Sequence, residues 1–294
     1  VWLVEFFRET YDGETVEKMA ASFLEEKKTT LYCLKGKGGK EALKKELEEE
    51  GIQAEDGFLC EEALRISGYD SLWRIPAFRQ GKCFVQDESS MLAASLAQAE
   101  AGQLVLDLCS APGGKAMYMA DQMRGEGMVI ARDLTEDKTD LIEENTERTE
   151  LENIRVEMAD ARILDEDMIG RADIVLADLP CSGLGIMGRK NDIKYNADRN
   201  QMRELAVLQR NILKNAAAYV KPGGALIYST CTINPEEKEE NYRWIQKESG
   251  FRPEDLRPLL PESLVSDTAE KGWIQLLPGI HPCDGFFVGK LRRV

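Results

Sequence analysis

Histidine is almost absent from this sequence of 294 residues, in which His281 is the single example. Hydrolysis by a Ser–His–Asp triad and metal sites built from several histidines both need this side chain, so both classes are disfavoured. The seven cysteines are odd in number and widely spaced, with no Cys-x-x-Cys pair. This pattern predicts neither a disulfide framework nor a metal site, and it is typical of the reducing cytoplasm.

Long apolar segments are missing as well. The apolar runs are far shorter than the roughly 18 residues that can span a bilayer, and the N-terminus does not resemble a secretion signal. We therefore expect a cytoplasmic protein without membrane association. Because residue 1 is valine and not methionine, we also expect the chain to begin inside a longer polypeptide.

Positive charge is scarce, since 38 lysines and arginines stand against 53 acidic residues and leave a net charge of −15. Such a balance disfavours a general nucleic-acid binder. Residues 186–214 are the exception, with seven basic and three acidic side chains. This stretch contains Arg189, Lys190 and Lys194, and a local basic patch of this kind is compatible with a structured RNA partner.

A change of pattern near residue 85 divides the chain. Residues 1–85 mix short helices and strands with glycine turns, which predicts a small α+β accessory domain that could contact RNA. In residues 86–294, strands alternate with helices, which predicts an α/β domain with a mostly parallel sheet. The strands expected in this domain span residues 104–109, 128–133, 154–159, 172–178 and 225–230. The helices expected between them span residues 87–100, 114–124, 136–149, 199–220 and 234–247.

Ligands of parallel sheets bind beyond the carboxyl ends of the strands, so the residues that follow each strand matter most. After the first strand, glycines allow close backbone approach to a ligand within Cys109-Ser110-Ala111-Pro112-Gly113-Gly114-Lys115. The phosphate-loop pattern is not met, because Cys109 stands where its first glycine belongs. The loop suits an adenosine-type cofactor better, although a plain tight turn has the same appearance.

Acidic residues follow the second and third strands. Asp133 lies about twenty residues beyond the glycines, where a carboxylate can accept both hydroxyls of a ribose. Asp160 is placed to meet an adenine amino group. Each acid alone could equally serve as a helix-start or loop residue, and only the combination with the glycine loop indicates a cofactor.

Two cysteines follow the fourth and fifth strands, in Asp178-Leu179-Pro180-Cys181 and in Ser229-Thr230-Cys231. A single buried cysteine is usually structural, but a pair at neighbouring strand ends beside a cofactor loop favours catalysis. Asn234 and Glu237 predict a capped helix start after Cys231, and a helix N-terminus favours the thiolate.

A thiol beside a methyl donor fits methylation at C5 of cytosine. This carbon is a poor nucleophile until a thiolate adds to C6 and makes C5 enamine-like. Protonation of N3 assists the addition, which is a role suited to Asp178 if burial raises its pKa.

These motifs resemble the bacterial Sun-type RNA cytosine-5 methyltransferases of the RsmB and RsmF type. The similar segments run in the family's order through residues 86–90, 107–115, 178–185, 189–195, 221–237 and 284–291. The resemblance implies a class I, Rossmann-like methyltransferase sheet, S-adenosylmethionine as cofactor and RNA as substrate, with 16S ribosomal RNA expected.

The resemblance also implies roles for individual residues. Cys231 would be the nucleophile and Cys181 would assist product release, while Lys115 would reach the active site from the cofactor loop. The segment Cys109–Lys115 would cradle the cofactor, with Asp133 at the ribose, Asp160 near the adenine and Asp178 between cofactor and cytosine. Arg189, Lys190 and Lys194 would touch RNA, and we expect the protein to act as a monomer.

The sequence departs from the family pattern at Ser110, Arg132 and Leu179, and at Tyr32-Cys33-Leu34, where an RNA or pocket contact could be lost. Two other functions compete with the main prediction. A methyltransferase acting on tRNA, protein or a small molecule would leave both cysteines without a role. An inactive RNA-binding protein of ribosome assembly would have no reason to keep Cys181, Cys231 and Asp178.

Overall fold

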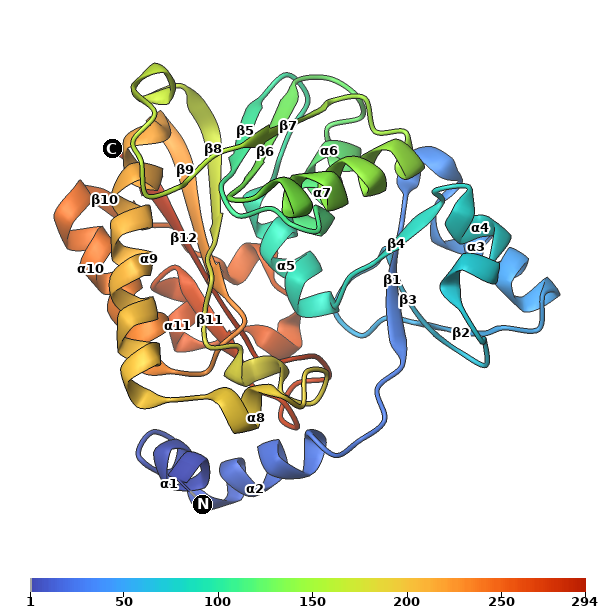
Figure 1. The fold of residues 1–294 in the computed structure, drawn as a ribbon, viewed down its shortest axis with the longest axis horizontal. Coiled ribbons are helices and arrows are strands. Elements are labelled where there is room, and N and C mark those ends of the chain that lie inside the picture. The colour runs from blue at the N-terminus through green and yellow to red at the C-terminus, as the bar shows by residue number, and fades with distance from the viewer. Residues whose placement is uncertain (1) are drawn as a thin grey trace.

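The chain folds around two β-sheets of different size (Figure 1). The structure, a computed structural model, describes residues 2–294. All strands of the smaller sheet come from residues 29–85, and all strands of the larger sheet come from residues 104–293. The division of the chain into two domains at residue 85 stays a prediction.

The larger sheet has the strand order β10-β12-β9-β8-β5-β6-β7, with β11 paired to β12. The strands from β5 to β9 run parallel, whereas β12 runs antiparallel to β9. Their bounds are β5 Leu104–Asp107, β6 Met128–Asp133, β7 Ile154–Met158, β8 Ala172–Asp178, β9 Val220–Thr230, β10 Phe251–Pro253, β11 Trp273–Leu276 and β12 Phe286–Arg293. The predicted α/β fold with a parallel central sheet is confirmed. The predicted start of the fifth strand is wrong, because β9 begins at Val220 and residues 221–224 bulge out between two pairings with β8.

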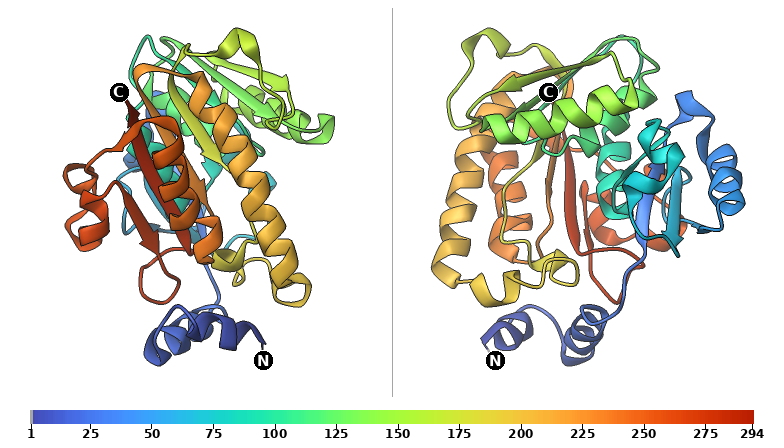
Figure 2. Two further views of the ribbon diagram at one scale, coloured as in Figure 1. Left: turned by 90° about the vertical axis from the view of Figure 1, so that its left-hand side faces the viewer. Right: turned by 45° about the vertical axis from the view of Figure 1, so that its right-hand side comes forward.

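Helices cover both faces of the larger sheet (Figure 2). Their bounds are α5 Glu88–Ala97, α6 Gly114–Gln122, α7 Glu136–Thr149, α8 Ile193–Asn196, α9 Arg199–Tyr219, α10 Glu239–Ser249 and α11 Asp267–Glu270. Side chains of α5, α6 and α7 pack with Val105 on one face, and side chains of α9 and α10 pack with Leu106 on the other. Val105 and Leu106 point to opposite faces of the sheet, and both are fully buried. Strand β5 therefore lacks the alternation of apolar and polar residues that marks a half-exposed strand. Within residues 2–294, no helix is both long and apolar enough to cross a bilayer.

The smaller sheet has the antiparallel order β2-β3-β1-β4. Its strands are β1 Thr29–Cys33, β2 Gln53–Asp56, β3 Ala63–Ser67 and β4 Cys83–Val85. The helices of this part of the chain are α3 Gly39–Glu49 and α4 Pro76–Arg79. Leu31 and Cys33 pack under α3 and α4, whereas Tyr32 points to the opposite face. There Tyr32 packs on Tyr118 of α6 at a centroid distance of 4.8 Å and donates a hydrogen bond to Asp121. The departure from the family pattern at Tyr32 therefore lies in the contact between the sheets.

The two N-terminal helices, α1 Trp2–Arg8 and α2 Gly13–Ser22, lie apart from the smaller sheet (Figure 1). Phe7, Val16 and Met19 pack instead with Leu184 and Met187, which follow Cys181 in the chain. The first segment of the chain thus supports the loop after β8.

The helix expected over residues 234–247 is only partly correct. Asn234 does act as a cap, but it caps a short 3-10 turn, Pro235–Glu237, and α10 begins at Glu239. The predicted capping box is wrong, because the Glu237 carboxylate accepts hydrogen bonds from Ser182 N–H and from the Asn234 side chain. The Glu237 carboxylate therefore binds the Cys181 loop and does not accept a hydrogen bond from the backbone N–H of Asn234, as a capping box requires.

Candidate functional site

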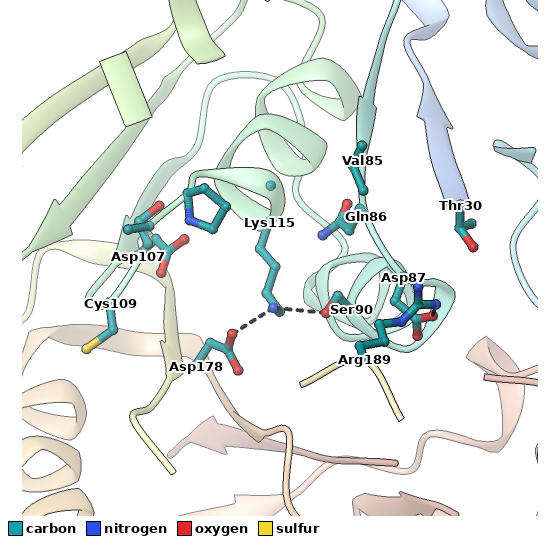
Figure 3. Close-up of a pocket in the computed structure, with 14 residues that line it drawn as sticks. Thr30, Val85, Gln86, Asp87, Ser90, Asp107, Cys109, Lys115, Asp178 and Arg189 are labelled. Carbon is teal, nitrogen blue, oxygen red and sulfur yellow. Dashed lines mark hydrogen bonds and ion pairs between the residues drawn. The ribbon is translucent and has the colours of Figure 1, made fainter. Parts of the chain in front are cut away.

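Some of the polar residues predicted from the strand ends, among them Cys109, Lys115 and Asp178, line a cavity of about 250 Å³ at the carboxyl edge of β5 and β8 (Figure 3). Its walls come from the segment 85–90 and the glycine loop, together with Asp178 and Arg189. The predicted site residues therefore lie at the carboxyl edge of the sheet, where parallel sheets bind their ligands.

The two cysteines of this edge are in contact, with 3.1 Å between the Sγ atoms of Cys181 and Cys231. The register explains the proximity, because Asp178 of β8 lies opposite Ser229 of β9 and each cysteine follows shortly after. The hydrogen bond with Cys231, together with burial, raises the pKa of the Cys181 thiol well above its ordinary value. All seven cysteines are free thiols.

A buried network of hydrogen bonds fixes the loop that carries Cys181. The Glu237 carboxylate accepts from Ser182 N–H at 2.8 Å and from the Gln209 side-chain amide at 3.2 Å. That amide also donates to the carbonyl of Pro180 at 2.8 Å. The hydroxyls of Ser182 and Thr232 lie 2.7 Å apart and join the two cysteine loops. Burial raises the pKa of Glu237, while these hydrogen bonds partly offset the effect.

Lys115 and Asp178 form an ion pair of 2.7 Å, which Figure 3 shows. Asp178 accepts a second hydrogen bond from Ser229 at 2.8 Å, so both of its oxygens face donors. Burial alone would lower the pKa of Lys115, but the charge and hydrogen bond of Asp178 outweigh it, and the pKa is raised. The pair thus keeps a proton on Lys115, next to the carboxylate of Asp178.

The glycine loop folds back on Asp133. This carboxylate accepts from Ala111 N–H at 3.0 Å, from Leu134 N–H at 2.7 Å and from Lys138 Nζ at 2.8 Å. Gly113 has a φ of 99°, and an added Cβ would lie 3.2 Å from the side chain of Ile142. The loop needs glycine there for both reasons. Burial raises the pKa of Cys109, which keeps this third thiol of the edge neutral.

Three buried polar side chains near the loop carry oxygens that have no hydrogen-bond partner among the described residues. They are Asp107, Ser110 and Gln86, whose side-chain oxygens lie within or beside the same cavity. Burial raises the pKa of Asp107 to about 7. Unpaired buried groups are costly, so they indicate a place for a polar ligand. The site predictions missed Asp107 and Gln86, although both lie in segments that resemble the family.

Asp160 lies in a different cavity, of about 490 Å³, with Leu108, Arg132 and Tyr219. Its carboxylate is bound by Arg162, which donates from Nε at 2.8 Å. Arg132 is buried and paired with Glu157 and Asp165, both at 2.8 Å. The structure therefore separates Asp160 from the cavity beside Lys115. Within residues 2–294, no group of three His, Cys, Asp or Glu side chains is arranged to hold a metal.

The three basic residues predicted to bind RNA differ in their surroundings. Arg189 pairs with Asp87 at 2.8 Å and with Asp284, and it lines the cavity. Lys190 and Lys194 are exposed, and the Nζ of Lys194 lies 5.0 Å from the ring of Tyr195. The charge of Arg189 is thus largely compensated, whereas the two lysines face solvent.

Comparison with known sequences reveals close relatives. Residues 93–292 match the family model described as 16S rRNA methyltransferase RsmB/F. Probable ribosomal RNA small subunit methyltransferase B of Bacillus subtilis is 36% identical over 99% of this chain and 66% of the relative. Ribosomal RNA small subunit methyltransferase F of Escherichia coli is 33% identical over 80% of this chain and 50% of the relative. The chain thus spans about two thirds and half of the lengths of these relatives.

Solved structures show the same fold. The crystal structure of PH0851 superposes with a TM-score of 0.92 at 29% identity, over 99% of this chain and 65% of that one. NSun6 from Pyrococcus horikoshii, solved with SFG, gives a TM-score of 0.87 at 21% identity over 99% of this chain and 97% of that one, a likeness of fold alone. Because the family model covers most of the sequence, the chain belongs to the 16S rRNA methyltransferase RsmB/F family.

Proposed function

We propose that this protein methylates C5 of a cytosine in ribosomal RNA of the small subunit, with S-adenosylmethionine as the donor. The observation that carries the proposal is the 3.1 Å contact between Cys181 and Cys231, beside the Lys115–Asp178 ion pair. Methyl transfer to nitrogen or oxygen needs no covalent thiol, so another type of methyltransferase would leave this pair without a role.

Cys231 is the nucleophile in this proposal, as the family resemblance implies. Its thiolate forms a bond to C6 of the cytosine, and N3 takes up a proton, which leaves C5 enamine-like. Lys115 is a charged donor at this site, because it binds Asp178 and lies close enough to Cys231 for their charges to interact. The ion pair supplies the proton to N3, with Asp178 relaying and orienting it.

Cys181 assists product release. Once C5 is methylated, its proton must leave before the C6–S bond breaks and Cys231 departs as a thiolate. The largest cause of the raised pKa of Cys181 is its hydrogen bond with Cys231. That bond is lost when Cys231 carries the cytosine, so the pKa of Cys181 falls and its thiol can lose its proton to solvent. The resulting thiolate accepts the C5 proton, the C–H electrons form the C5=C6 double bond as the C6–S bond breaks, and the N3 proton returns to the Lys115–Asp178 pair.

The glycine loop and its neighbours fit the cofactor. Residues Cys109, Ser110, Ala111, Pro112, Gly113, Gly114 and Lys115, with Asp133 and Asp178, would hold it, and its adenine end would extend toward the separate cavity that Asp160 lines. Bound S-adenosylmethionine supplies an electrophilic methyl group on a sulfonium. The free oxygens of Asp107 and Gln86 are acceptors suited to the cationic end of such a molecule.

RNA contacts are assigned to the basic stretch. Lys190 and Lys194 are exposed and can meet phosphates, while Arg189 lines the cavity and is paired with Asp87 and Asp284. We further propose that the protein acts as a monomer in the cytoplasm, where reducing conditions keep Cys181 and Cys231 as thiols.

Methyl transfer to unmodified 16S ribosomal RNA, transcribed in vitro, tests the proposal. Tritiated S-adenosylmethionine reports transfer, and bisulfite sequencing then locates the modified position. We expect one protected cytosine and tritium release from RNA labelled at C5 of cytosine. Methylation found at nitrogen or at ribose oxygen would refute the covalent mechanism.

A further inference from the structure

A second cavity, of about 460 Å³, adjoins the cavity beside Lys115 and shares Thr30, Asp87 and Arg189 with it. These three residues lie together in Figure 3, on the side away from Cys109. The further walls come from the segment after α2, from the smaller sheet and from the loop before β12. None of these segments has a role in the mechanism above.

An exposed aromatic platform forms one wall of this second cavity. Phe58 has 57% of its surface exposed, and the guanidinium of Arg65 lies 4.1 Å from the centroid of its ring. Arg65 makes no ion pair among the residues that the structure describes. A flat ring covered by a free guanidinium is the kind of surface on which nucleobases stack.

The loop that carries Phe58 is fixed to the active-site side of the molecule. The Glu88 carboxylate accepts from the N–H groups of Phe58 at 3.0 Å, Leu59 at 2.5 Å and Cys60 at 3.0 Å. At Gly57, an added Cβ would lie 2.7 Å from a Glu88 oxygen, so the close approach needs glycine. Glu88 begins α5 and follows Asp87, which binds Arg189, so the platform is held in a set position relative to Lys115.

The charges around the cavity favour a base over a phosphate. Four cations and five carboxylates line it: Lys27, Lys28, Arg65, Arg189, Glu25, Glu26, Asp87, Glu88 and Asp284. A phosphate site would need an excess of positive charge. The neutral polar groups are Ser22, Thr30 and His281. The Nδ1 of His281 accepts from Leu277 N–H at 2.8 Å, and burial lowers the pKa of this side chain. Neutral His281 therefore carries its proton on Nε2 and can donate one hydrogen bond.

We propose that this cavity holds the base of a nucleotide flanking the target cytosine, stacked on Phe58 and Arg65. The inference rests on the proposed function, because a flanking base exists only if the substrate is RNA. The volume is of the size expected for one bound nucleotide-sized ligand. Stacking here would position the cytosine at Cys231 and would contribute to the choice of target.

Steady-state methylation of a synthetic RNA fragment that contains the cytosine mapped above tests this inference. Phe58→Ala should raise the KM for RNA about tenfold, because stacking on an aromatic ring contributes strongly to single-strand binding, while kcat and cofactor affinity stay near wild type. Phe58→Leu keeps an apolar side chain but removes the flat ring, so it should raise KM similarly without loss of melting temperature. Trp73→Ala is the matched control, since Trp73 is 59% exposed on the same part of the chain but lies outside the cavity.

Abasic substitutions in the RNA make the test specific. With wild-type protein, removal of the base at one flanking position should raise KM by the same factor as Phe58→Ala, and the two changes together should add little. Equal KM values for Phe58→Ala and Trp73→Ala, or indifference of the wild type to every abasic position, would overturn the inference while the proposed function stands. Absence of any cytosine methylation by the wild type would overturn both.

Discussion

The two halves of the candidate site differ in how their buried polar groups are satisfied. In the half that carries the cysteines, the Glu237 carboxylate accepts hydrogen bonds from Ser182, Asn234 and Gln209. In the half that faces the glycine loop, Asp107 is equally buried but neither of its oxygens has a hydrogen bond of good geometry in the described residues. The Ser110 hydroxyl and the Cys109 N–H lie only close enough to offset part of the rise in its pKa. The first half is therefore preorganised by the protein, whereas the second half leaves polar groups for a ligand to satisfy.

This difference distinguishes the residues proposed to act on the cytosine from the residues proposed to bind the cofactor. A buried carboxylate without hydrogen-bond partners lowers the stability of the folded protein. We therefore expect Asp107 to serve in ligand binding and not in stability. A fully hydrogen-bonded network such as that of Glu237 instead makes the cysteine loops rigid. Substitutions in the two halves should therefore change catalysis, affinity and stability in different ways.

The largest expected effect is that of Cys231→Ala. Without a nucleophile, methyl transfer should fall by more than about a thousandfold, while the affinity for S-adenosylmethionine stays near wild type. Single-turnover transfer and equilibrium dialysis measure the two quantities. Cys83→Ala, which removes a buried thiol from the core of the smaller sheet, is the control. Substantial remaining activity in Cys231→Ala would refute the covalent role.

Cys181→Ala should block product release and not the first addition. We expect turnover to fall about a hundredfold, with accumulation of a protein–RNA adduct that survives denaturing electrophoresis. The double variant with Cys231→Ala should form no adduct, which shows that Cys231 makes the bond. If Cys181→Ala forms no adduct with a good substrate, the release role is wrong.

Asp107→Asn tests the half that faces the cofactor. In the folded protein the pKa of Asp107 is raised from its ordinary value to about 7, so the native state binds a proton that the unfolded chain releases between these values. Stability is therefore lost as the pH rises toward 7, and Asp107→Asn should be more stable than wild type at pH 8 by about 2 kcal/mol. Thermal melts across the pH range measure this gap, with the exposed Asp140→Asn as control.

The same variant should lose affinity for S-adenosylmethionine. Wild-type affinity should increase as the pH rises through about 7, because the ionised Asp107 carboxylate meets a cationic ligand. Asp107→Asn should bind about tenfold more weakly at pH 8 and show a flat pH profile. A wild-type affinity that does not vary with pH would mean that Asp107 does not contact the cofactor.

The smallest effect on catalysis is expected for Glu237→Gln, with a change of stability opposite to that of Asp107→Asn. A glutamine amide turns a donor toward Ser182 or Asn234, so at least one buried donor loses its acceptor, at about 1–3 kcal/mol of stability. We expect a lower melting temperature and a several-fold lower kcat, because the Cys181 loop loosens. Glu236→Gln, at the neighbouring and more exposed position, should change neither. Equal melting shifts for both glutamine variants would remove the contrast between the halves.

Much of the fold could be predicted because its signals are local. Apolar runs such as Leu104–Asp107 mark buried parallel strands, and the glycines at Gly113 and Gly114 mark the turn that follows. Since parallel strands end at one edge, the chemistry of that edge follows from what stands after each strand. The positions of Lys115, Asp178, Cys181 and Cys231 after their strands therefore predict that the four side chains lie at one edge of the sheet.

The partners of individual polar atoms could not be predicted in this way. Glu237 has the spacing of a capping box but binds the loop after β8, and Arg189 looks like a free RNA-binding cation but pairs with Asp87 and Asp284. In each case a residue distant in sequence competes successfully with the local partner or with solvent. The periodic patterns that predict helices and strands do not show which distant residue will form the hydrogen bond or ion pair.

The order of side-chain types along the chain was therefore sufficient to determine the parallel sheet, the glycine loop and the pair of cysteines at adjacent strand ends. Tertiary structure alone decided which buried oxygens are satisfied and which remain free, and it placed Phe58 and Arg65 beside the cavity that holds Lys115. The physical reason is that periodicity and turn chemistry act over a few residues. Hydrogen bonds and stacking between distant segments depend on how the finished elements pack.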